Sequence, residues 1–148
     1  MDGIVILPDT NLKYLSHSHD TDGATIIIHV ESKSTEASCP YCGEISNKVH
    51  SRYKRKLQDL PIQGKKVRLV IDNKKYFCSN EACNHKTFSE PFSFFEPKAT
   101  KTKRLHEEIL RVSLTQSSLS AAKYLKKSVA DIGKSTICNM LKKTRENR

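Results

Sequence analysis

The sequence predicts an α+β fold, in which a small β-rich domain comes first and three helices follow. Two observations predict this order. The first 90 residues contain strand-like stretches such as Val67, Leu69 and Ile71, where apolar residues alternate with polar ones, and two cysteine pairs lie among them. From Thr100 onward the apolar residues recur three or four positions apart, which is the period of an amphipathic helix.

Four of the five cysteines form two close pairs, Cys39 with Cys42 and Cys78 with Cys83, with 35 residues between the pairs. Strands in that interval would bring the pairs together, and four thiolates make a closed tetrahedral site that suits Zn²⁺. The spacing therefore predicts a zinc ribbon with one structural zinc ion. Zinc binding would add on the order of 10 kcal/mol to the stability of a small core.

Other interpretations of the cysteines are unrelated reduced thiols or two disulfides in a secreted protein. The chain begins Met1-Asp2-Gly3, without the basic start of a signal peptide, so we expect no oxidising compartment. His85 follows Cys83 by two residues and could replace it as fourth ligand. We prefer Cys83, because two cysteine pairs already complete a structural site.

The positive charge of the chain is concentrated in its last two thirds. The 148 residues have a formal net charge of +10, although residues 1–38 contain more acidic than basic side chains. This distribution favours a polyanion such as nucleic acid as partner. The densest basic run is Arg52, Lys54, Arg55 and Lys56, which we predict to contact phosphates, the alternative being a solvated strand face.

Four segments follow from these patterns. Residues 1–38 are predicted to form a β-hairpin, with strands over 12–15 and 24–30 and a polar turn over 16–23, that leads into the ribbon of residues 39–90. Residues 91–99 hold several Phe and Pro residues without periodicity, and we predict an extended linker whose Phe side chains cover the ribbon. Residues 100–148 are predicted to form a helix-turn-helix domain.

Three helices are predicted over residues 101–114, 118–126 and 135–145. Their inner faces would contain the apolar side chains Leu105, Ile109, Val112, Leu119, Ala122, Leu125, Ile137, Met140, Leu141 and Thr144. Such a bundle fits a helix-turn-helix domain whose third helix enters the major groove, although any basic three-helix bundle would show the same pattern. On the outer face of the third helix we predict four DNA contacts: Thr136, Asn139, Lys142 and Lys143.

The chain resembles bacterial insertion-sequence transposases of the ISL-three family. The resemblance is carried, in order, by Cys39-Pro40-Tyr41-Cys42-Gly43, Val49-His50-Ser51-Arg52-Tyr53-Lys54-Arg55, Asp59-Leu60-Pro61, Val67-Arg68-Leu69, and Cys78 to Cys83 followed by Thr87-Phe88. It implies a zinc ribbon, then a helix-turn-helix segment, and binding to the terminal inverted repeats of a mobile element. The family continues into a catalytic domain with an Asp-Asp-Glu metal triad, for which these residues offer no counterpart.

We therefore expect a DNA-binding module of a transposase that is not an enzyme on its own. The expected partner is double-stranded DNA; we expect no membrane association, and a cytoplasmic location at the nucleoid. Two alternatives remain open at this point: a stand-alone DNA-binding regulator, and a zinc-stabilised domain whose basic face meets an acidic protein. A homodimer is possible, and the sequence decides neither the oligomeric state nor the target site.

Overall fold

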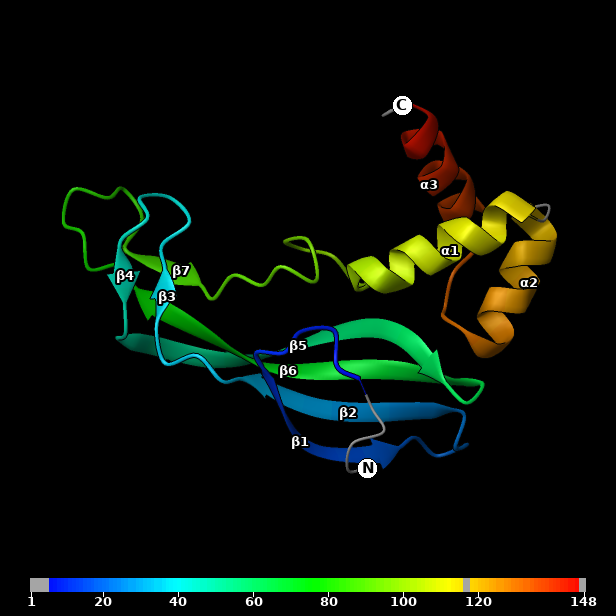
Figure 1. The fold of residues 1–148 in the computed structure, drawn as a ribbon, viewed down its shortest axis with the longest axis horizontal. Helices are drawn as coiled ribbons and strands as arrows, with labels where there is room; N and C mark the ends of the chain where they lie inside the picture. The colour runs from blue at the N-terminus through cyan, green and yellow to red at the C-terminus, as the bar shows by residue number, and fades with distance from the viewer. Residues whose placement is uncertain (1–5, 116–117, 147–148) are drawn as a thin grey trace.

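A five-stranded sheet forms one layer of the molecule, and three helices follow it at one end (Figure 1). The computed structural model describes residues 6–115 and 118–146. The strands of this sheet are β1 (Leu12–His19), β2 (Thr25–Ser32), β5 (Val49–Ile62), β6 (Lys65–Phe77) and β7 (Thr87–Ser89). Their order is β1-β2-β6-β5, and β7 pairs with β6. Two short strands, β3 (Ala37–Ser38) and β4 (Ile45–Ser46), pair separately.

The sheet is built on the long antiparallel hairpin of β5 and β6, whose strands have 14 and 13 residues. Ile62 pairs with Lys65 across a two-residue turn made by Gln63 and Gly64. Both turn residues have positive φ, 50° and 75° respectively, as a type I′ turn requires. This turn matches the right-handed twist of the strands, so the hairpin can continue without splaying.

The N-terminal hairpin of β1 and β2 belongs to the same sheet, because β2 lies parallel to β6 with Val30 opposite Ile71. The hairpin expected over 1–38 therefore exists but shares its sheet with the strands of the ribbon. The expected turn over 16–23 was too wide, since β1 continues to His19 and the turn occupies only the residues around Asp20 to Gly23. Asp20 caps it by accepting a hydrogen bond from the Thr25 backbone N–H.

One face of the sheet forms the larger core. Alternate residues of β2 and β6 are buried there, among them Ile28, Leu69 and Ile71. Phe94 and Phe95 of the segment after β7 complete this cluster, each only 7% exposed. The Phe side chains thus cover the sheet, as the sequence indicated.

The three predicted helices are confirmed as α1 (Lys103–Thr115), α2 (Ser118–Ser128) and α3 (Lys134–Glu146). Their core holds nearly all of the predicted apolar side chains, but Leu119 was assigned wrongly and is 54% exposed. Ala121, two positions on, is buried in its place. Two residues correspond to about 200° of helix rotation, so both cannot face inward. None of the helices in the described ranges has the length and apolar character needed to cross a membrane.

A buried carboxylate joins the sheet to α1. Asp59 of β5 is 2% exposed and accepts hydrogen bonds from Thr102 Oγ1 at 2.8 Å and from Arg104 Nε and Nη2 at 2.8 and 2.5 Å. Thr102 Oγ1 also accepts the Leu105 backbone N–H at 3.3 Å, which caps the helix N-terminus. The start of α1 is therefore fixed by the same side chains that attach it to β5.

We predict that Arg104→Met lowers the free energy of unfolding by about 3 kcal/mol, because it leaves the Asp59 carboxylate buried without its countercharge. The matched control is Arg111→Met, whose ion pair with Glu108 lies on the exposed surface of α1 and should contribute less than about 0.5 kcal/mol. Urea unfolding of the zinc-loaded protein measures both. If both variants lost the same free energy of unfolding, the ion pair of Asp59 with Arg104 would not stabilise the attachment of the helices to the sheet.

Candidate metal centre and nucleic-acid surfaces

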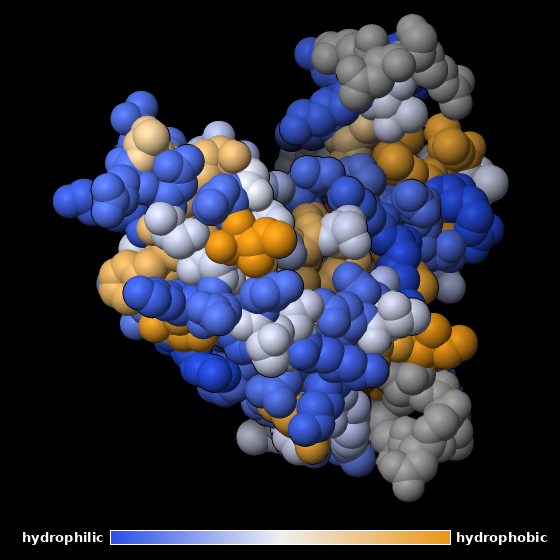
Figure 2. Space-filling view, turned by 60° about the vertical axis from the view of Figure 1, so that its left-hand side comes forward, coloured by the Kyte–Doolittle hydropathy of each residue, from blue (hydrophilic) through white to orange (hydrophobic). Residues whose placement is uncertain are grey.

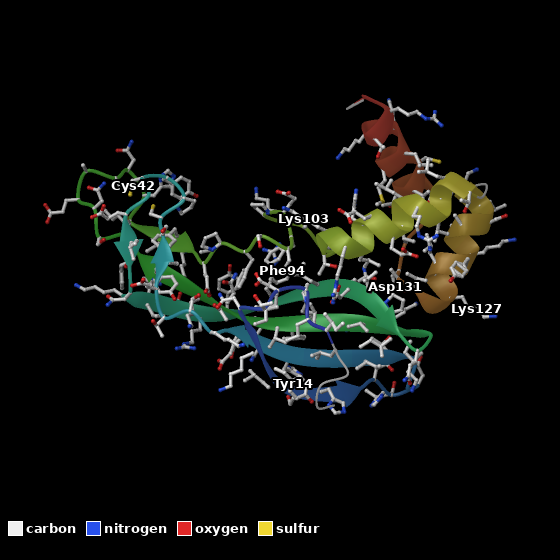
Figure 3. The ribbon with its side chains drawn as sticks, in the orientation of Figure 1. Tyr14, Cys42, Phe94, Lys103, Lys127 and Asp131 are labelled. Carbon is white, nitrogen blue, oxygen red and sulfur yellow. The ribbon has the colours of Figure 1, made fainter. Side chains whose placement is uncertain are left out.

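The two cysteine pairs lie in two tight loops at the end of the sheet farthest from the helices (Figures 1 and 3). In the first loop the Gly43 backbone N–H donates to the Cys39 carbonyl at 2.8 Å, with Gly43 at a φ of 82°. A residue other than glycine would be strained there. In the second loop the Asn80 side-chain oxygen accepts a hydrogen bond from the Ala82 backbone N–H at 3.0 Å. The Cys83 backbone N–H donates to the Asn80 backbone carbonyl. These bonds turn both loops so that their sulfurs face one another.

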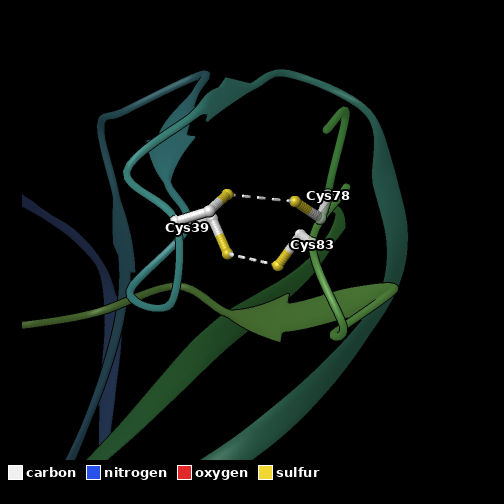
Figure 4. A group of neighbouring side chains, drawn as sticks. Cys39, Cys78 and Cys83 are labelled. Atoms are coloured by element: carbon white, nitrogen blue, oxygen red, sulfur yellow. Dashed lines mark hydrogen bonds between the residues drawn. The ribbon is translucent and has the colours of Figure 1, made fainter. Parts of the chain in front are cut away.

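The four sulfurs of Cys39, Cys42, Cys78 and Cys83 all lie within 4.8 Å of one another. The Sγ atoms of Cys39 and Cys83 are 4.0 Å apart, and those of Cys42 and Cys78 are 3.6 Å apart (Figure 4). A tetrahedral zinc ion with Zn–S bonds of about 2.3 Å places its sulfurs about 3.8 Å apart, so these distances fit zinc. They are far beyond the roughly 2.05 Å of a disulfide. The predicted site for one structural zinc ion is confirmed.

The electrostatics of the cluster also call for a cation. The backbone N–H of Glu44 lowers the pKa of Cys42 to about 7. At Cys78 the backbone N–H of Asn80 acts in the same direction, but burial and the neighbouring thiols outweigh it and raise the pKa to about 12. Four sulfurs this close resist ionising together, and a divalent cation supplies the charge that stabilises them as thiolates.

His85 lies next to the metal site but outside the group of four cysteines. Within the described residues the group able to hold a metal ion contains only the four cysteines. The His85 ring instead stacks on Tyr41, with ring centroids 3.5 Å apart and an angle of 6° between the planes. The stack lies across the two loops and leaves Tyr41 59% exposed.

A comparison with protein families matches residues 35–83, about a third of the chain, to a model described as the zinc-finger of transposase IS204/IS1001/IS1096/IS1165. These residues form a zinc ribbon of the transposase type. The matched segment contains both cysteine pairs and the whole β5–β6 hairpin between them. No match was found among curated proteins or among solved structures.

The predicted basic run lies on β5, where successive side chains point to opposite faces of the sheet. Arg52, Lys54 and Lys56 share the face away from the linker, and all three are exposed. Lys54 forms an ion pair with Asp72 at 3.2 Å, and its side chain remains 60% exposed. These three side chains form a basic strip on the uncovered face of the sheet.

Arg55 points to the other face and has a structural role that the sequence did not indicate. Its guanidinium lies 5.2 Å from the centroid of the Phe95 ring and donates to the Ala99 carbonyl at 2.9 Å. Both partners belong to the segment after β7. Arg55 therefore attaches this segment to the sheet, whereas its neighbours in sequence are free to meet solvent.

The predicted contacts on α3 are all at its surface: Thr136, Asn139, Lys142 and Lys143 are exposed, while Ile137 and Met140 pack inward. In Figure 1 this helix lies beyond α1, past the β5 edge of the sheet. The connection between α2 and α3 contacts the sheet face that carries the basic strip, because Asp131 pairs with Lys66 Nζ at 2.7 Å and its backbone N–H donates to Gln58 Oε1 at 2.8 Å.

Sequence reasoning missed the basic residues that α1 places beside α3. Burial, with repulsion from Lys101 and Lys143, lowers the pKa of His106. Burial likewise lowers the pKa of Lys101. His106 of α1 thus lies close both to Lys101, just before the helix, and to Lys143 of α3. The run from Lys101 to Arg104, which has three basic residues among four, was the available signal.

We predict one zinc ion per chain, lost in Cys42→Ser because a hydroxyl cannot replace the thiolate in a four-sulfur site. Zinc content and far-UV circular dichroism measure the loss of metal and of folded ribbon together. Two controls should retain one zinc: Cys138→Ser, which changes an exposed cysteine on α3, and His85→Ala. Full zinc occupancy in Cys42→Ser, or its loss in His85→Ala, would contradict the assigned ligands.

Proposed function

We propose that this chain is a DNA-binding module of a transposase, that it recognises the ends of a mobile element, and that it has no catalytic activity on its own. The observation that carries the proposal is the transposase-type zinc ribbon at residues 35–83. The sheet of this ribbon is attached to the helices through Asp59, Thr102 and Arg104. A rigid connection of this kind lets two DNA-binding elements act at a fixed separation.

The helices supply base recognition in this proposal. We infer that α2 and α3 form a helix-turn-helix unit, with residues 129–133 as the connection, and that α3 enters the major groove. The exposed Asn139 amide would pair with the N6 and N7 edge of adenine, and Thr136 would contact an adjacent base. Lys142, Lys143 and the nearby Lys101 would meet phosphates.

The ribbon would add affinity that does not depend on sequence. Arg52, Lys54 and Lys56 would contact phosphates through the uncovered sheet face, and Arg55 is left out because its guanidinium is already bonded to Ala99. Selection of bound sequences from a random duplex library tests whether the chain has a preferred site at all.

We expect Asn139→Ala to weaken specific binding by about 1 to 3 kcal/mol and to change nonspecific binding little, since a bidentate base contact reads sequence. Lys142→Ala should weaken both and reduce the slope of log affinity against log salt by about 0.9. Fluorescence anisotropy on the selected duplex and a scrambled duplex, over a salt series, measures both effects. Lys33→Ala, an exposed lysine on the acidic N-terminal segment, is the control and should change neither. If Asn139→Ala and Lys142→Ala lost equal affinity on the selected and the scrambled duplex, α3 would not be the recognition helix.

We expect the purified chain to bind its DNA in Mg²⁺ or Mn²⁺ without nicking or joining it. Phosphoryl transfer of this kind uses divalent cations held between carboxylates, and the proposal gives the chain no such role for its own carboxylates. A labelled duplex at protein concentrations that saturate binding provides the assay. Metal-dependent cleavage that disappears when one of the chain's own carboxylates is substituted would overturn the non-catalytic part of the proposal.

A further inference from the structure

A cavity of about 380 Å³ lies where the first cysteine loop, β5, β6 and the segment after β7 meet. Its volume falls within the range of about 300 to 1,000 Å³ that small-molecule sites occupy. It is lined by Tyr41 of the cysteine loop, by Tyr53 of β5 and by Phe92 and Phe95 of the segment after β7. The zinc site is thus next to the cavity but takes no part in its wall.

The walls of the cavity are aromatic and already held in place. Tyr41 is stacked on His85, and Phe95 lies under the Arg55 guanidinium and against Phe92, with a ring separation of 5.6 Å. Tyr53 Oη accepts the Asn73 side-chain N–H at 2.8 Å and donates to Ser89 Oγ at 3.1 Å. Fixed aromatic faces bind flat rings with little loss of side-chain entropy.

Two acceptor oxygens behind these walls lack a donor. Asn73 Oδ1 and Glu90 Oε1 are buried and have no hydrogen-bond partner within the described residues. Both residues line the cavity, and they are 3% and 5% exposed. Since an unpaired buried acceptor is costly, this side of the cavity favours a ligand with N–H groups that the two side chains can turn to meet.

The lining of the cavity includes two basic residues. Arg55 and Lys98 both line it. Lys98 has a φ of 65°, which a residue with a side chain adopts only at a cost, and such strained residues are enriched at ligand sites. A phosphate attached to the bound ring would meet the Lys98 ammonium, while the Arg55 guanidinium stays bonded to the Ala99 carbonyl.

We propose that this cavity binds a single unstacked nucleobase of a DNA strand, in an orientation that directs an amino group of the base towards Glu90 and Asn73. The inference rests on the proposed function, because DNA is the partner that presents a flat ring, an amino group and a phosphate together. Cytosine, adenine and guanine carry such an amino group, whereas thymine presents a carbonyl at the corresponding edge.

The position of the cavity agrees with this role. The segment after β7 covers the sheet face on which Phe94 and Phe95 pack, and it leads into α1 at the β5 edge of the sheet (Figure 1). The space-filling view shows the ribbon end and the C-terminal helices as two lobes with a hollow between them (Figure 2). A strand end released from a duplex held by α3 would cross this hollow to reach the cavity.

The test uses the full zinc-loaded chain and first compares three labelled duplexes that are identical except at one position: fully paired, with one extra unpaired cytosine, and with one unpaired abasic site. We expect the unpaired cytosine to bind at least about fivefold more tightly than the abasic site, the lower limit for stacking one base on aromatic side chains. An unpaired thymine should bind less tightly than cytosine. A fluorescent 2-aminopurine at the same position should be quenched on binding.

Tyr41→Ala and Phe92→Ala should each reduce the preference for the unpaired cytosine while retaining binding to the paired duplex. The control is Tyr14→Ala, which removes a half-exposed aromatic ring from β1, on the edge of the sheet away from the ribbon loops (Figure 3). Glu90→Gln keeps the shape of the side chain. It should reduce the difference in affinity between the duplexes with an unpaired cytosine and an unpaired thymine.

The failures of the two proposals can be told apart. Binding to the paired duplex with equal affinity for cytosine and abasic duplexes would overturn the base-binding cavity and leave DNA recognition intact. An undiminished cytosine preference in both Tyr41→Ala and Phe92→Ala would also overturn it, because the base would then be bound elsewhere. Absence of binding to any of the three duplexes and to the library would overturn the proposed function itself.

Discussion

The convergence of four cysteine sulfurs at one end of a single long hairpin is the constraint on which the rest of this structure depends. β6 runs directly into Cys78, and β5 begins a few residues after Cys42, so the metal closes the open end of the hairpin while Gln63 and Gly64 close the other. Without a cation the thiols oppose joint ionisation, as the pKa of about 12 at Cys78 indicates. Zinc binding is therefore coupled to pairing of the two long strands.

Once this hairpin is formed, it organises both halves of the molecule. Along β6 it pairs with β2, which brings the N-terminal hairpin into the sheet, and one face of the enlarged sheet becomes the site for Phe94 and Phe95. Near the turn of the hairpin, two residues of β5 bond the helical region. Asp59 accepts hydrogen bonds from Arg104 of α1, and Gln58 accepts the backbone N–H of Asp131, between α2 and α3, at 2.8 Å. The ribbon is thus the scaffold from which α3 is presented.

The same arrangement separates the functions of neighbouring residues. On β5 the side chains alternate between a covered and an open face, so Arg55 stabilises the segment after β7 while Lys54 and Lys56 meet solvent. The covered face also has the aromatic cavity at its ribbon end. In the proposed function the basic strip, the cavity and the helices all contact DNA. Because one rigid sheet fixes the distances between them, only DNA of a matching shape can contact all of them at once.

The sequence by itself determined the features that depend on local spacing. The zinc ligands follow from Cys-x2-Cys and Cys-x4-Cys loops, and the three helices from apolar residues that recur with helical period, so their observed bounds differ from the predicted ones by only a few residues. Tertiary structure alone decided the parallel pairing of β2 with β6, the exposure of Leu119, the different roles of Arg55 and its neighbours, and the cavity beside the ribbon. These features depend on which distant segments pack together. The strand pattern shows that Ile28 and Leu69 are buried but not that they are buried side by side, since alternation specifies a face and leaves the partner strand to long-range packing.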